Sequence, residues 1–145
     1  MSFRTKIIIA AVVIALAVYA IFAFDVPYQK LSADLAFLDA PAAGQAISSP
    51  AEISGRALGR MYFEAVFPVD VLAADQTTVI GSGQATAQTD WTAQGYVPFT
   101  AKISFKQGTS TRGYIRLKND NPSGRPELEV SVSFPVAFGT STNRI

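Results

Sequence analysis

Apolar and polar residues alternate with a period of two along most of the chain after residue 44. The pattern is clearest in four segments, which cover residues 61–73, 98–106, 113–118 and 127–134. In the second of these, Phe99, Ile103 and Phe105 lie at odd positions, and Lys102 and Lys106 lie between them. Because successive side chains of a strand point to opposite faces, this alternation predicts four strands that each bury one face.

Three weaker segments raise the number of predicted strands to seven: residues 46–49, 52–58 and 77–87. The last contains Gly81 and Gly83, which predict a bulge or bend in that strand. No helical pattern separates the strands, so their apolar faces must pack sheet against sheet. The sequence therefore predicts an all-β domain, a seven-stranded immunoglobulin-like β-sandwich without the disulfide of antibody domains.

An uncharged apolar run, Ile7–Phe24, follows Arg4 and Lys6 near the start of the chain. As a helix it would be about 27 Å long, close to the roughly 30 Å hydrocarbon core of a bilayer. It predicts one N-terminal transmembrane α-helix, residues 1–24, that anchors the protein in the cell membrane by a single pass. The basic flank places the C-terminal part outside the cytoplasm. A cleaved secretory signal is the alternative, and it would release the protein.

The rest of the chain divides into three predicted parts. Residues 25–44 form a tether, in which Leu31, Leu35 and Leu38 have the spacing of a short helix over about residues 29–38. Residues 45–139 form the sandwich, and residues 140–145 form a C-terminal tail.

The chain has no Cys and no His, and its formal net charge is +1. These absences exclude disulfides, thiol catalysis and thiolate metal sites, and they remove the commonest general base and metal-ligating side chain. Glu64 and Asp70 would lie about 20 Å apart on one strand, too far for the carboxylate pair of a glycosidase. We expect no enzyme activity, cofactor, metal or nucleic-acid partner, since nucleic-acid binding usually needs a strongly basic face.

Five cations lie on or beside two predicted strands that follow one another in the chain: Lys102, Lys106, Arg112, Arg116 and Lys118. If residues 99–106 and 112–119 form a hairpin, these cations share one face, which would suit an anionic cell-wall polymer or lipid headgroups. In an immunoglobulin sandwich, however, these two strands belong to opposite sheets, which would divide the set.

Trp91 is the one large aromatic residue in a probable loop between two predicted strands. If it is exposed, it could stack on a sugar as part of a polymer or partner contact. If it is buried, it closes one end of the sandwich, with its indole N–H hydrogen-bonded.

Several short motifs occur in an order that resembles the immunoglobulin-like domain of bacterial spore-germination proteins: Ile47–Pro50, Ser54–Gly55, Phe63–Glu64, Pro98–Phe99 and Phe134–Phe138. The resemblance covers about residues 45–139, as a single copy behind the anchor. It implies a bacterial envelope β-sandwich without established catalytic residues. We therefore expect a non-enzymatic, membrane-anchored module for adhesion or for assembly with an envelope protein, with cell-wall polymer or carbohydrate binding as the alternative.

Overall fold

The computed structural model describes Thr5 and residues 34–139. The apolar run Ile7–Phe24, residues 25–33 of the predicted tether and the tail 140–145 lie outside these residues, so the anchor and its cleaved alternative stay predictions. In the described part of the chain, no helix has the length and hydropathy needed to cross a membrane.

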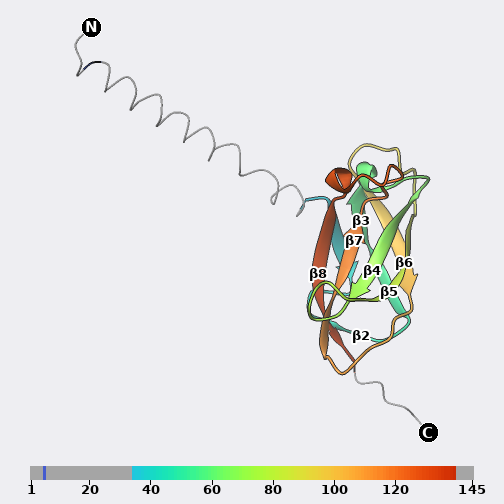
Figure 1. Cartoon of the computed structure of the whole chain (residues 1–145). Coiled ribbons are helices and arrows are strands. Elements are labelled where there is room, and N and C mark those ends of the chain that lie inside the picture. The colour runs from blue at the N-terminus through green and yellow to red at the C-terminus, as the bar shows by residue number, and fades with distance from the viewer. Residues whose placement is uncertain (1–4, 6–33, 140–145) are drawn as a thin grey trace. The chain divides into compact units, whose positions relative to one another are not determined.

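The described residues form an all-β domain, as the alternation predicts (Figure 1). Its strands are β1 (Ala36–Ala40), β2 (Ala46–Ile47), β3 (Ala51–Leu58), β4 (Val66–Leu72), β5 (Val79–Ala87), β6 (Tyr96–Ile103), β7 (Arg112–Lys118) and β8 (Ser131–Phe138). Two 3₁₀ turns, η1 (Gly59–Met61) and η2 (Pro126–Leu128), lie at one end of the domain.

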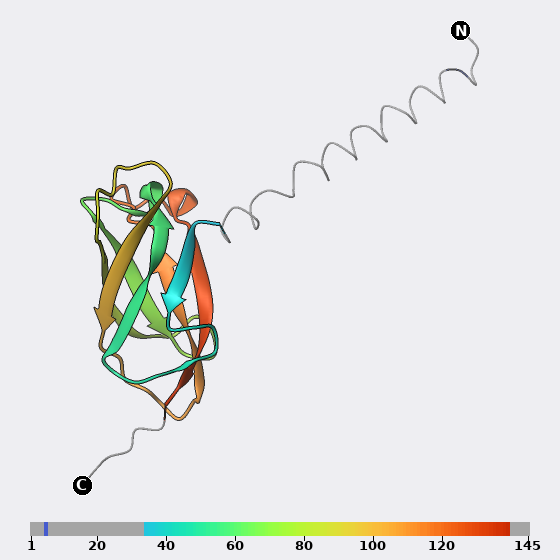
Figure 2. The ribbon, with the colours of Figure 1, turned by 180° about the vertical axis from the view of Figure 1, so that it is seen from behind.

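The strands form one hydrogen-bonded sheet in the order β1-β3-β6-β5-β4-β7-β8-β2. The sheet curls so that β1, β3 and β6 pack over β4, β7 and β8 (Figures 1 and 2). An immunoglobulin sandwich places its strands A, B, E and D in one sheet and C, F and G in the other. The order here is the same when β1, β3, β6 and β5 are matched to the first set and β4, β7 and β8 to the second.

Strand β1 corrects the predicted tether. Residues 36–38, predicted to end a short helix, lie in a strand that pairs antiparallel with β3, from Ala36 opposite Ala57 to Ala40 opposite Ser54. Leu35 and Ala36 are buried in the core, because β1 covers the edge of β3. This long-range pairing outweighs the local helical spacing, and it makes β1 an eighth strand beside the seven predicted.

Strand β5 joins the two layers. Its residues 79–86 pair with β4, and Ala85–Ala87 pair with β6. A Cβ atom at Gly81 would lie 2.5 Å from the carbonyl oxygen of Ser104, so only glycine lets the chain pass this closely. The pairing with β4 also shifts register near this point. Gly81 and Gly83 therefore mark the bend that the sequence predicts.

The predicted strand over residues 61–73 is shorter than its alternation indicates. Phe63 and Val66 exchange backbone hydrogen bonds of 2.9 and 3.1 Å around a two-residue turn. Within it, Glu64 and Ala65 have φ values of 50° and 68°, the conformation of a type I′ turn. Glu64 is thus a turn residue, and Phe63 is 44% exposed instead of buried in the core.

The last predicted strand also starts later than expected. Leu128 lies in η2 and is 49% exposed, and the strand itself begins at Ser131. The predicted alternation holds within β6, where Val97, Phe99 and Ile103 are buried. It also holds in β7, where Ile115 and Leu117 are buried.

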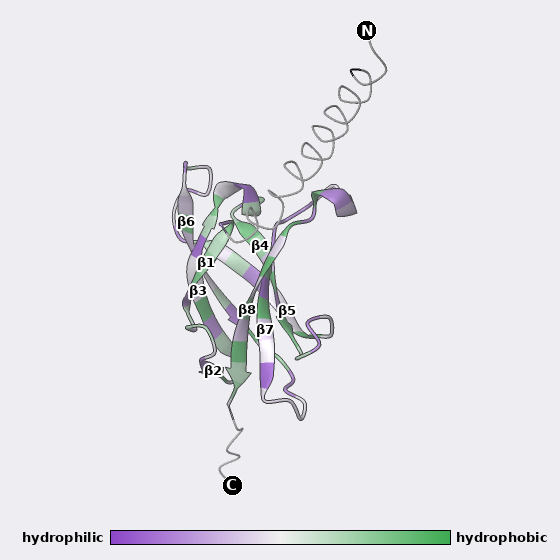
Figure 3. Cartoon of the chain, turned by 90° about the vertical axis from the view of Figure 1, so that its left-hand side faces the viewer, coloured by the Kyte–Doolittle hydropathy of each residue, from purple (hydrophilic) through white to green (hydrophobic). Residues whose placement is uncertain are grey.

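The core lies between the two layers and is built from the inward side chains of the strands. Phe67 contacts the rings of both Tyr62 and Phe99 edge to face, with centroids 4.9 and 5.0 Å apart. The Tyr62 hydroxyl donates to the carbonyl of Val97 at 2.8 Å, so the polar end of that ring is satisfied. Hydrophobic and hydrophilic positions alternate along the strands in Figure 3. The sheet faces that point away from this core are left to interact with other molecules.

Candidate functional site

The five predicted contact cations do not share one face. Strand β6 pairs with β3 and β5, whereas β7 pairs with β4 and β8, so the hairpin of residues 99–106 with 112–119 does not form. Lys102 lies on β6, and Lys106 follows that strand. The other three lie on β7 in the opposite layer: Arg112, Arg116 and Lys118. The division is the one that an immunoglobulin topology requires.

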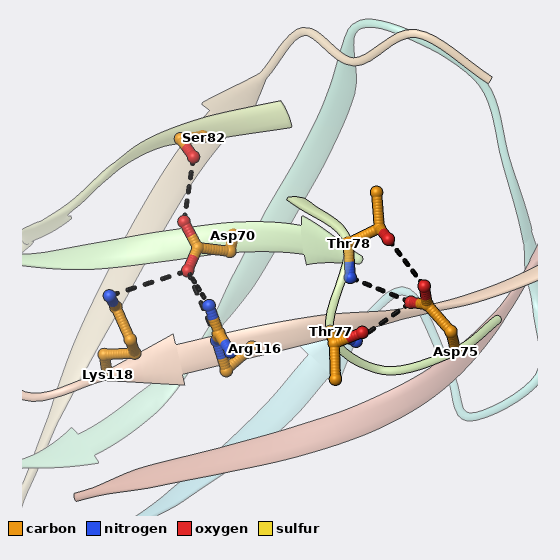
Figure 4. Close-up of polar contacts among 7 residues, drawn as sticks. All are labelled: Asp70, Asp75, Thr77, Thr78, Ser82, Arg116 and Lys118. Atoms are coloured by element: carbon orange, nitrogen blue, oxygen red, sulfur yellow. Dashed lines mark hydrogen bonds and ion pairs between the residues drawn. The ribbon is translucent and has the colours of Figure 1, made fainter. Parts of the chain in front are cut away.

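A carboxylate on β4 binds two of the β7 cations (Figure 4). Asp70 is 6% exposed, the lowest value for a charged residue in the described part of the chain. Its Oδ2 atom accepts from Arg116 Nη2 at 2.6 Å and Nε at 3.2 Å, and Lys118 Nζ lies 3.7 Å away. Ser82 of β5 donates its hydroxyl to Oδ1 at 2.8 Å. We call Asp70, Ser82, Arg116 and Lys118 the Asp70 network.

The Asp70 network holds its carboxylate ionised. Burial alone would raise the pKa of Asp70, but hydrogen bonds from Arg116 and Ser82 and the charges of Lys118 and Arg116 outweigh it and lower that pKa. Each strand pairing in this part of the sheet, β5 with β4 and β4 with β7, thus gains a polar link across its outer face. The network is suited to joining strands, because neither oxygen of its carboxylate is left without a partner.

Among the described residues, the partners of Asp70 are Ser82, Arg116 and Lys118, and no second carboxylate is hydrogen-bonded to it. Glu64, the other carboxylate considered in the sequence, lies in the turn before β4 and not on that strand. Over residues 34–139, no group of three or more acidic, His or Cys side chains could hold a metal ion.

Trp91 packs against the core from the loop between β5 and β6, and it is half-buried. The ring also lines a hollow of about 390 Å³ with Leu58, Arg60 and Ala93. Trp91 is thus neither fully buried nor fully exposed, and both alternatives for its role stay predictions.

The N-terminal half of β8, residues Ser131–Phe134, is an open sheet edge; it is the upper half of that strand in Figure 1. Hydrogen bonds of Val130 with Asn119 and of Phe138 with Thr111 set the ladder with β7, so even-numbered residues of β8 face that strand. The odd-numbered residues point their backbone groups outward. Strand β2 pairs only with Ala137 and Phe138, and Gly44 donates to Pro135. Among the described residues, no strand pairs with the outward groups of Ser131 and Ser133.

Sequence reasoning missed this edge because it depends on which strand covers β8, and no local pattern reports that. The two serines at 131 and 133 are a weak signal in retrospect, since a polar outward row is also typical of an ordinary solvent-facing strand.

Comparison with known proteins identifies one family. The family model described as the immunoglobulin-like domain of bacterial spore germination matches residues 36–125. The match includes β1, which confirms that this strand belongs to the domain. The search of curated proteins found no match. The search of solved structures found none either.

Proposed function

Since this chain belongs to the family of immunoglobulin-like domains of bacterial spore germination, we propose that it is a non-enzymatic envelope module that assembles with another protein. The apolar run Ile7–Phe24 anchors it in the cell membrane, and the sandwich lies on the outer side. Its partner contributes an extended segment that adds as a strand to the upper half of β8.

The open edge of β8 carries this proposal. Ser131 and Ser133 each present one backbone N–H and one C=O away from β7, and both side chains are exposed. Main-chain hydrogen bonds along such an edge give affinity in strand addition, and the side chains beside it give selectivity. The covered lower half of β8 limits the added strand to a few residues at Ser131–Phe134.

Membrane anchoring makes a short interface sufficient. A module and a partner confined to one membrane surface meet at a raised effective concentration, so a contact that is weak in solution is populated in the envelope. Such a role needs recognition and no chemistry, which agrees with a carboxylate that is fully engaged within its own sheet.

Site-specific photo-crosslinking in intact cells tests the edge. A crosslinker at Ser133 should capture one protein, and one at Gln107, an exposed residue between β6 and β7, should not. Adding Ser131→Pro should abolish that capture, because proline removes a donor from the edge, while Ser131→Ala should preserve it. Equal capture at both sites, or capture unaffected by Ser131→Pro in a folded protein, would contradict strand addition.

The location has its own test. A reporter enzyme that works only outside the cytoplasm should be active when it is fused after residue 145. Recovery of the mature protein from membranes with residues 1–24 still present supports the anchor. Recovery of a shortened protein from the medium supports the cleaved alternative.

A further inference from the structure

A row of small side chains crosses the outer face of the layer formed by β1, β3, β6 and β5. Ala40 lies opposite Ser54, Ser54 opposite Thr100, and Thr100 opposite Thr86. With strands about 4.8 Å apart, the row is roughly 14 Å long. Three of its four members carry hydroxyl groups. We call this row, with the longer side chains below it, the hydroxyl trough.

Longer polar side chains form the lower wall of the hydroxyl trough. Glu52 lies opposite Lys102, and Gln84 of β5 lines the same hollow. The hollow has a volume of about 470 Å³, within the range of roughly 300–1,000 Å³ that is usual for small-molecule sites. The contrast between short floor residues and long wall residues creates the depression on an otherwise continuous sheet face.

One end of the trough is fixed by Gln88. Its Nε2 atom donates to Thr100 Oγ1 and to the carbonyl of Thr86, both at 3.0 Å. Because Thr100 Oγ1 accepts this bond, its own O–H is left to donate to another molecule. The floor of the trough therefore offers the Thr100 hydroxyl as a donor.

An apolar rim lies beyond the upper side of the trough. Two residues further along their strands lie Arg56 and Pro98, and Phe37 lies opposite Arg56. The ring of Phe37 contacts the ring of Tyr96 edge to face at 5.2 Å, and the Arg56 guanidinium lies 5.2 Å from the Phe37 centroid. Tyr96 is 42% exposed and is one of four exposed large hydrophobic residues in the described part of the chain.

We propose that the hydroxyl trough is a binding site for a chain of uncharged sugars. Sugar hydroxyls both donate and accept, and the trough presents both kinds of group, from three hydroxyls, an amide, a carboxylate and an ammonium. The rim supplies apolar surface for the C–H faces of a sugar ring. A row about 14 Å long suits an oligosaccharide better than a single ring.

The charges and the backbone of the trough exclude two other ligand classes. Glu52 lies 3.8 Å from Lys102 and offsets its charge, so a polyphosphate meets little net positive charge at this wall. The backbone of β3 and β6 is already paired on both sides, so an added peptide strand finds no free edge here. The site is on the layer opposite β8, and it does not depend on the proposed protein contact.

Titration calorimetry with the full chain in detergent micelles tests the proposal. The probes are chitohexaose and cellohexaose, two uncharged chains that differ in their N-acetyl groups, and poly(glycerol phosphate) as the charged competitor. We expect at least one of the two glycans to bind. Thr100→Val and Thr86→Val should each weaken that binding about tenfold, because they keep the shape and remove a hydroxyl.

Ser131→Ala is the matched control, since it removes a hydroxyl from the outer face of β8 and should leave glycan binding unchanged. Thermal unfolding of each variant shows that a loss of binding is not a loss of fold. Absence of binding to every glycan at millimolar concentration would overturn the proposal. So would glycan binding that both Thr variants retain, or binding of poly(glycerol phosphate) alone.

Discussion

Arg116 of β7 and Asp70 of β4 lie opposite each other in the sheet and share one carboxylate oxygen through two guanidinium nitrogens, at 2.6 and 3.2 Å. The pair lies on the outer face of the sheet but is largely covered, and Ser82 and Lys118 are the other partners of the carboxylate. The Asp70 network therefore joins β4, β5 and β7 on the outer face of the sheet, while the apolar core packs against the inner face.

Removing the charge of Asp70 should destabilise the domain. Asp70→Asn leaves the partly buried Arg116 and Lys118 without their shared counter-charge, and we expect a loss of about 2–3 kcal/mol in the free energy of unfolding. Urea denaturation of wild type and Asp70→Asn measures this difference in the free energy of unfolding. Glu52→Gln is the matched control, because Glu52 and Lys102 are 83% and 66% exposed and their pair should contribute less than about 0.5 kcal/mol. Equal losses of stability in the two variants would contradict the prediction that the Asp70 network stabilises the domain more than the exposed Glu52–Lys102 pair does.

The same carboxylate should make stability depend on pH in the acid range. The pKa of Asp70 is lower in the folded protein than its ordinary value, and the pKa of Asp75 is lowered to about 2 by hydrogen bonds from Thr78 and Thr77. A lowered folded-state pKa gives stability that is present above the unfolded-state value, near pH 4, and lost as the pH falls through the folded value. The free energy of unfolding should decline from about pH 5 toward pH 2.

Denaturation at several pH values follows this decline, and Asp70→Asn should reduce its slope. A slope that is identical in wild type and Asp70→Asn would show that this carboxylate titrates alike in the folded and unfolded chain.

The turn between η1 and β4 should accept glycine with a gain in stability. Ala65 has a φ of 68°, a conformation that costs a residue with a Cβ atom roughly 1–2 kcal/mol. Ala65→Gly should therefore raise the free energy of unfolding by about 0.5–1 kcal/mol, after the greater freedom of glycine in the unfolded chain is included. Ala137→Gly, within β8, should lower it instead. If Ala65→Gly lowered the free energy of unfolding as Ala137→Gly does, the result would contradict the type I′ turn at Glu64 and Ala65.

Close approach of β1 to β3 should make Gly55 intolerant of a side chain. A Cβ atom there would overlap the carbonyl oxygen of Phe37 and press on the ring of Phe99. Gly55→Ala should lower the free energy of unfolding by about 1–3 kcal/mol or more, since the backbone of β1 at Phe37 would have to move away. At Gly108, where a Cβ atom would meet nothing within 4 Å, the same substitution should be nearly neutral. Thermal unfolding compares the two, and a neutral Gly55→Ala would place β1 farther from β3.

The all-β fold could be predicted because burial of one face imposes a visible period on each strand. Val97, Phe99 and Ile103 show how directly that period reports the core. The helical spacing of Leu31, Leu35 and Leu38 was misleading at its end because β1 is fixed by pairing with β3, a partner that lies well beyond any local window.

The candidate sites were less visible for the same reason. Ser54, Thr86 and Thr100 come from three strands and form a row only once their register is known. The basic residues were predictable as outward-facing, but their division between layers follows from β7 pairing with β4 and β8. In the sequence, Asp70 was considered only as one of two distant carboxylates, and its alignment with Arg116 and Ser82 shows that its partners come from two neighbouring strands.

Because β5 bonds to a neighbour on each side, one continuous ladder of hydrogen bonds joins the two layers along this side of the domain. If the strands of either layer unfolded, β5 would lose its hydrogen bonds to β4 or to β6, and the aromatic side chains of the core would be exposed to water. Amide hydrogens of β3 and β7, although they lie in opposite halves, should therefore exchange with solvent through the same global opening.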